Sequence, residues 1–148
     1  MKQQYPVLAA IVWVASIGSI GMSGASSAAE DSRQLVELPA MMQHHMLSNM
    51  RDHLQTINQI LLKLTQGEMD QAADLAEYRL GMSSLASHNA SHMAKFMPEE
   101  MRQIGMGMHH AASRFALVAQ QGEAAPAYHA LTEVTSACVA CHAAYRIR

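Results

Sequence analysis

The pattern of hydrophobic and polar positions predicts helices along most of the chain after residue 30. In the first segment, apolar residues recur at spacings of three and four, which place them on one face of a helix. They are Met42, Met46, Met50, Ile57, Ile60, Leu61 and Leu64, with His53 on the same line. Pro39 suits the first helical position and Gly67 follows the last apolar residue, so we expect this helix to run from Pro39 to about Thr65.

Three further segments carry the signals of helix ends. Asp70 is an acid suited to a first turn, Gly81 suits a helix end, and Pro98 is followed directly by Glu99 and Glu100. We therefore expect helices at about 70–80, from 98 to near 122 and at about 126–145, with a longer connection at 82–97.

The composition favours the same structural class. Strand signals are few, and no Asn-Gly or Asp-Gly pair marks a hairpin, whereas Ala, Met, Leu, Gln and Glu form helices well. Four amphipathic helices joined mostly by short connections predict an all-α fold, an antiparallel four-helix bundle. The formal net charge of −2, without a basic stripe, predicts no nucleic-acid partner.

The first 29 residues have the composition of a secretory signal peptide. Lys2 precedes an apolar stretch at 6–22, and small residues follow up to Ala29. We expect cleavage after Ala29, which leaves a domain of residues 30–148 with no membrane span. The alternative is an uncleaved anchor, for which the apolar stretch is at the short end.

The two cysteines of the chain lie in the run Cys138-Val139-Ala140-Cys141-His142. A C-x-x-C-H string is typical of c-type haem attachment, with thioether bonds from both cysteines and the histidine as an axial iron ligand. Spacings of three and four place Cys138, Cys141 and His142 on one helix face. A thioredoxin-like pair needs a βαβ context, zinc usually needs a second ligand pair, and a disulfide here would close almost no loop. The sequence therefore predicts one covalent haem c, attached after export to the periplasm.

The stretch from Thr135 to Arg146 resembles the end of class II c-type cytochromes, the cytochrome c′ family. In that family the attachment motif lies on the last helix of a four-helix bundle, and an aromatic-Arg pair follows the haem histidine by three and four residues. The resemblance implies that Tyr145 packs on the proximal side of the haem and that Arg146 lies near its edge or a propionate. It also allows a homodimer packed through the first two helices.

The residue facing the iron from the other side divides that family by function. A methionine of the first helix gives a low-spin haem for electron transfer, whereas an apolar residue leaves the iron open to NO or CO. The resemblance favours Met50, one turn after the alternative Met46; His53 or no ligand stay open. Arg51 forms a local charge pair with Asp52 or neutralises a haem propionate.

The leading hypothesis is a periplasmic electron carrier that docks transiently with redox partner proteins. The alternatives are a gas-binding protein and a copper- or zinc-binding bundle, in which His88 and His92 have the i,i+4 spacing of a shared metal site. The pairs His44-His45 and His109-His110 are further candidates for metal binding. No Ser-His-Asp, paired-carboxylate or phosphate-loop arrangement appears in the sequence, so we predict that the protein is not an enzyme.

Overall fold

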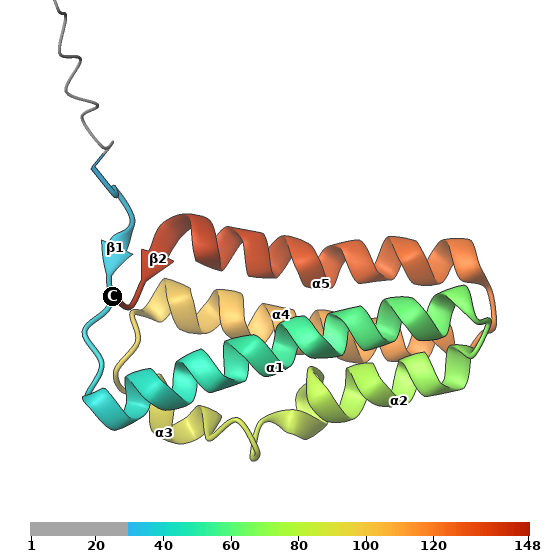
Figure 1. Cartoon of the computed structure of the whole chain (residues 1–148), viewed down its shortest axis with the longest axis horizontal. Helices are drawn as coiled ribbons and strands as arrows, with labels where there is room; N and C mark the ends of the chain where they lie inside the picture. The colour runs from blue at the N-terminus through green and yellow to red at the C-terminus, as the bar shows by residue number, and fades with distance from the viewer. Residues whose placement is uncertain (1–29) are drawn as a thin grey trace, which may run out of the picture. The chain divides into compact units, whose positions relative to one another are not determined.

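The structure is a computed structural model that describes residues 30–148, within which residues 32–148 form one compact unit (Figure 1). The predicted signal peptide and its cleavage site after Ala29 lie outside the described residues. Among the helices of the described part, we find none that combines the length and the apolar character needed to cross a membrane.

The described part is mostly helical, which confirms the all-α class. Two strands, a single 3-10 turn and five α-helices follow one another along residues 30–148. In chain order they are β1 (Gln34–Leu35), α1 (Ala40–Thr65), α2 (Met69–Arg79), η1 (Met82–Ser84), α3 (Ala90–Ala94), α4 (Glu99–Ala119), α5 (Ala124–Ala144) and β2 (Tyr145–Arg146). The four long helices lie within a few residues of the predicted ranges.

Local signals account for several of the helix ends. Pro39 and Pro98 are the residues immediately before α1 and α4, so each helix begins one residue later than the sequence analysis predicted. Gly67 and Gly122, with φ of 74° and 82°, follow the ends of the same two helices. Glycine adopts this left-handed conformation without steric cost, so both positions end a helix where the chain must turn back.

Packing links the long helices in chain order. α1 packs on α2, α2 on α4 and α4 on α5, whereas α1 and α5 share no comparable interface. In Figure 1, α1 and α4 run in one direction and α2 and α5 in the other. The start of α1 and the end of α5 therefore lie at the same end of the unit.

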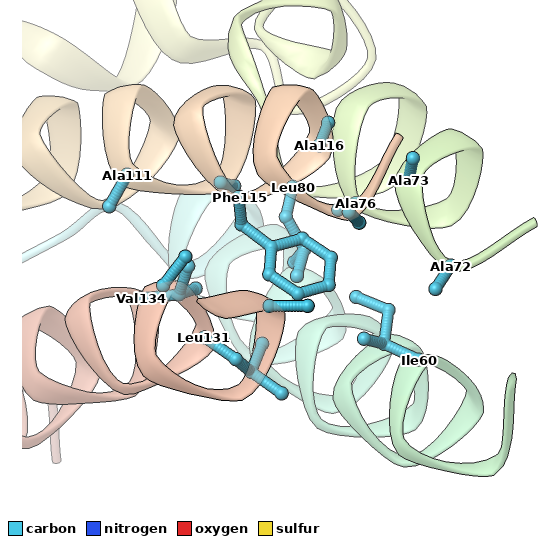
Figure 2. Close-up of a cluster of buried hydrophobic side chains, with 14 of the residues drawn as sticks. Ile60, Ala72, Ala73, Ala76, Leu80, Ala111, Phe115, Ala116, Leu131 and Val134 are labelled. Atoms are coloured by element: carbon cyan, nitrogen blue, oxygen red, sulfur yellow. The ribbon is translucent and has the colours of Figure 1, made fainter. Parts of the chain in front are cut away.

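The hydrophobic core surrounds the fully buried ring of Phe115 on α4. Figure 2 shows this ring pointing between Ile60 of α1 and Leu131 of α5. Alanines supply much of the remaining contact surface and let the helix backbones approach closely; they include Ala72, Ala73, Ala76, Ala112, Ala119 and Ala127. Each large buried apolar side chain contributes about 1.5–3 kcal/mol relative to exposure, so this region carries much of the stability.

The predicted apolar stripe of the first helix is rotated relative to the observed one. Leu61 keeps 39% of its surface exposed, whereas Thr56 is fully buried together with Ile60 and Leu64. The Thr56 hydroxyl donates to the carbonyl of Asp52 at 2.8 Å, so its burial leaves no polar group unsatisfied. The correction follows from packing against α2, which decides the buried face.

Two features were not predicted. The expected connection at 82–97 contains η1 and α3, with Asn89 in the left-handed conformation (φ 53°) just before α3. In addition, the fourth helix ends one residue before Tyr145, because Tyr145 and Arg146 become extended and pair in parallel with Gln34 and Leu35. Two-residue strands leave almost no alternation to read in a sequence.

Candidate haem-binding residues and a histidine cluster

The C-x-x-C-H motif continues the core-facing stripe of α5. Ala127, Leu131 and Val134 are buried along this stripe, and the next positions at helical spacing are Cys138 and Cys141. Both cysteines are half-buried, and Cys138 packs against the edge of the core. The same helix face thus changes from core residues to the predicted haem thiols within two turns.

The two thiols are free and protonated near neutral pH. Neither cysteine forms a disulfide. Burial raises the pKa of both thiols, because a partly desolvated site disfavours the thiolate. Burial therefore favours the protonated thiol over the thiolate at both positions.

His142 lies on the last turn of α5, four residues after Cys138, with an exposed side chain. Its backbone carbonyl accepts a hydrogen bond from Arg33 at 3.4 Å. Beyond it, the half-buried Tyr145 and Arg146 form β2, and the amide of Val36 donates to the carbonyl of Arg146 at 2.8 Å. The segment before α1 thus holds the residues that directly follow the motif.

One face of α1 contacts the C-terminal residues of the chain. The side-chain amide of Gln43 donates to the carbonyl of Ile147. Met46 and Met50 follow Gln43 by three and seven residues, which is the spacing of one helix face. Both methionines are half-buried, as is Met42. Of the predicted distal ligands, the two methionines therefore share the face that meets the chain's C-terminal residues.

His53 belongs to a different group of side chains. Its Nε2 atom lies 3.3 Å from Nε2 of His88, and the two ring centroids are 4.7 Å apart. On the same side of α1, His45 and Asn49 form hydrogen bonds to the backbone carbonyl of His88 at 3.0 and 3.2 Å. His53 thus faces the segment between η1 and α3.

His109 of α4 completes a cluster with His53 and His88. Its ring centroid is 5.4 Å from that of His88 and 6.4 Å from that of His53. Burial is the main cause that lowers the pKa of all three imidazoles, to about 4 for His53, and their mutual repulsion adds to the effect for His53 and His88. All three are neutral at pH 7.

The sequence did not predict this cluster. The pair that it did predict as a shared metal site, His88 and His92, does not come together. His88 is buried, whereas His92 is exposed, because Asn89 breaks the helical path between them and α3 begins only at Ala90. The i,i+4 spacing therefore brings no shared site. The sequence did hold a signal for two of the three residues. His53 lies on the apolar line of the first helix and His109 directly follows a core methionine, and both positions indicate a side chain that faces the interior.

Arg51 and Asp52 do not pair as expected. Asp52 forms its ion pair with Arg79 of α2 instead, while Arg51 is exposed. Adjacent residues on a helix point about 100° apart, so a partner on the neighbouring helix is better placed. The contact of Arg51 with a haem propionate stays a prediction.

Comparison with protein-family models finds no match, and the comparisons with curated proteins and with solved structures find no significant match. The side chains themselves fit a c-type haem: two free thiols and an imidazole lie within five residues at the end of one helix. Cys138 and Cys141 also continue an interior stripe that the chain's own side chains cover only in part.

Proposed function

We propose that this chain is a periplasmic monohaem cytochrome of class II, a four-helix bundle that transfers electrons. Cys138 and Cys141 would hold one haem c by thioether bonds, and His142 and Met50 would ligate its iron. When bound, the haem supplies a one-electron Fe³⁺/Fe²⁺ couple.

The observation that carries this proposal is the position of the motif on α5. Both free thiols follow the buried stripe of the helix, and His142 is one turn beyond Cys138. Each S–H group can add across a vinyl double bond, with the sulfur bonding to one carbon and the hydrogen passing to the other. The addition has no leaving group.

The packing of the helices also supports a large apolar group between α1 and α5. These two helices share no extended interface, and burial falls along both toward the same end of the unit. On α1 it falls from Ile60 to Met50, and on α5 from Val134 to Cys141. A porphyrin would cover apolar surface that neither helix covers for the other.

The choice of Met50 rests on its height along α1. His142 lies eleven residues beyond Leu131 on α5, and Met50 lies ten residues before Ile60 on the oppositely directed α1. At a rise of about 1.5 Å per residue these steps are roughly 16 and 15 Å. Leu131 and Ile60 both belong to the cluster around Phe115, so Met50 is nearly level with His142, whereas Met46 is one turn further away.

The alternative ligand His53 is disfavoured by its surroundings. His53 lies three residues after Met50 on α1, and its imidazole packs against that of His88. Ligation by His53 would require breaking that contact. A methionine ligand would give the low-spin iron and small rearrangement on reduction that suit an electron carrier.

The experiment is expression with the intact leader in a bacterium that attaches c-type haem. We expect one covalently bound haem per chain, which persists on a denaturing gel, and a ferrous spectrum that CO does not change. A Cys138→Ala/Cys141→Ala variant should lose covalent haem. Wild-type protein without covalent haem would refute the proposal.

Two matched variants identify the distal ligand. Met50→Ala should convert the ferrous haem to a high-spin, CO-binding form, whereas Met46→Ala on the same helix face should keep the low-spin spectrum. The reverse result would assign Met46. A wild-type protein that binds CO at once would favour the gas-binding function over electron transfer.

A further inference from the structure

We propose that His53, His88 and His109 form a second site, which binds one divalent first-row transition metal ion that favours imidazole ligands. The three side chains come from α1, from the segment between η1 and α3, and from α4. The site uses none of the residues assigned to the haem, so it stands independently of the proposed electron-transfer function.

The first argument is the separation of two nitrogens. Nε2 of His53 and Nε2 of His88 are 3.3 Å apart. Two imidazoles bound to one tetrahedral ion at about 2.0–2.1 Å have nitrogens about 3.3–3.4 Å from each other. These two rings therefore need little movement to share an ion.

The second argument is the tautomer of His88. The hydroxyl of Ser84 donates to the carbonyl of Gly81 at 2.7 Å, so its oxygen is available as an acceptor. Nδ1 of His88 lies 3.2 Å from that oxygen and donates its proton to it. Nε2 of His88 consequently carries a lone pair, directed toward His53.

His109 has the same tautomer for a similar reason. Its Nδ1 atom lies 2.6 Å from the carbonyl of Leu80, which can only accept, so Nδ1 carries the proton and Nε2 the lone pair. Imidazoles that ligate metals characteristically donate their other N–H group to a carbonyl or a similar acceptor. Two of the three rings thus already have their outer contacts.

His109 is the ring that must move toward the other two for all three to bind one ion. No three His, Cys, Asp or Glu side chains of residues 30–148 have donor atoms gathered around one point. For three imidazoles on one ion, ring centroids lie about 5 Å apart when the bond lengths above apply. The centroid distances of His109, 5.4 and 6.4 Å, require a closure of about an ångström.

The surroundings favour the uncharged ligands and the cation. Burial keeps the three imidazoles neutral, so protons compete weakly for the lone pairs at neutral pH. Asp52, beside His53, supplies a negative charge, which its ion pair with Arg79 partly compensates. In the metal-free protein, the Nε2–H group of His53 donates to Nε2 of His88. On metal binding His53 changes tautomer: its proton passes from Nε2 to Nδ1 by exchange with solvent, so the ring stays neutral and Nε2 is free to ligate.

The experiment measures zinc uptake by the purified protein, whether or not it carries haem. After treatment with a chelator, equilibrium dialysis against Zn²⁺ should give one bound ion per chain. His53→Gln, His88→Gln and His109→Gln should each lower the affinity at least 100-fold. The exposed neighbours provide matched controls: His92→Gln and His110→Gln should change it less than twofold. Uptake lost in the controls but kept in the cluster variants, or no uptake by the wild type, overturns the proposal.

A milder variant separates metal binding from folding. Ser84→Ala removes the acceptor for Nδ1 of His88 without touching a ligand, and should lower the Zn²⁺ affinity about 10- to 100-fold. Its far-UV circular dichroism and its melting temperature in chelator give the control for folding. An unchanged affinity in Ser84→Ala would contradict the assigned tautomer, and with it the site.

Discussion

The two ends of the helical unit are built from the same four helices but are filled differently. Around Phe115, side chains of α1, α2, α4 and α5 close on one another, as Figure 2 shows. Toward the start of α1 and the end of α5, these two helices carry methionines, histidines and cysteines that are half-buried or exposed, whereas His88 and His109 from neighbouring segments are buried. The end around Phe115 is a closed apolar core made of protein side chains. The other end has side chains that can bind metals or haem where a core would have aliphatic ones.

The difference indicates that one end of the helices supplies stability and the other supplies binding residues. The closed end can hold the four helices in register without any cofactor, because its apolar contacts depend on protein alone. The other end can then present thiols, thioethers and imidazoles at defined heights. Changes at the two ends should accordingly differ in what they disturb.

The largest effect is expected at the closed end. Phe115→Ala removes a fully buried ring contacted from several helices and should lower the free energy of unfolding by about 3–5 kcal/mol. Leu117→Ala, on the same helix but 65% exposed, should change it by less than about 0.5 kcal/mol. Urea denaturation followed by circular dichroism measures both. Equal effects would mean that the ring does not organise this end.

At the other end, the next largest effect should depend on pH. The pKa of His53 is about 4 in the folded chain, against an ordinary 6.5, so the unfolded chain takes up the proton first as the pH falls. The contribution of His53 is fully present above pH 6.5 and is lost as the pH falls toward 4, a change of about 3 kcal/mol.

Denaturation at several pH values, with metal chelated, measures this dependence. His53→Gln should make the profile less steep between pH 6.5 and 4, with His88 and His109 supplying the remaining slope, whereas His92→Gln should leave it unchanged. A wild-type profile that is flat across this interval would contradict the burial of the cluster.

A smaller effect is expected at the junction between α2 and η1, which supports the histidine cluster. A methyl group on Gly81 would lie 2.8 Å from the carbonyl oxygen of Glu77 and 2.8 Å from the hydroxyl of Ser113. Gly81→Ala should therefore cost about 1–3 kcal/mol. Gly105→Ala on α4, where nothing lies within 4 Å of the added carbon, is the control and should not destabilise. Thermal melts of both variants test the contrast.

The smallest effect is expected for the ion pair beside the cluster. Asp52 and Arg79 are both substantially exposed, so Arg79→Gln should cost only about 0.2–1 kcal/mol, and less in high salt. Denaturation at low and high ionic strength measures the difference. A loss of several kcal/mol, insensitive to salt, would show that this pair is part of the interior of that end.

The sequence was sufficient for the features that depend on local order. Helical periodicity and the Pro and Gly signals predicted α1, α2, α4 and α5, and the position of Cys138, Cys141 and His142 on one helix follows from spacing alone. Which face of α1 is buried depends on α2, so the same periodicity favoured Leu61 although Thr56 is buried. Periodicity defines a stripe only to within one neighbouring position.

The histidine cluster and the strand pair were beyond such reasoning. His53, His88 and His109 are separated by 35 and 21 residues, and they meet because Asn89 interrupts the helical path and η1 turns His88 inward. The pairing of Gln34 with Tyr145 likewise joins segments with no periodic signal. Contacts of this kind depend on how whole elements pack, which a single sequence does not encode locally.

The strand pair has a consequence for the order of events during folding. Arg33 and His142 are 109 residues apart, so their contact closes one of the longest loops that this chain can form, at the corresponding cost in chain entropy. Contacts within and between successive helices form sooner. The last turn of α5 therefore gains its contact with Arg33, and β2 its contact with Val36, only after both ends of the domain have emerged and met. Until then, the thiols beside it belong to the slowest part of the molecule to become fixed.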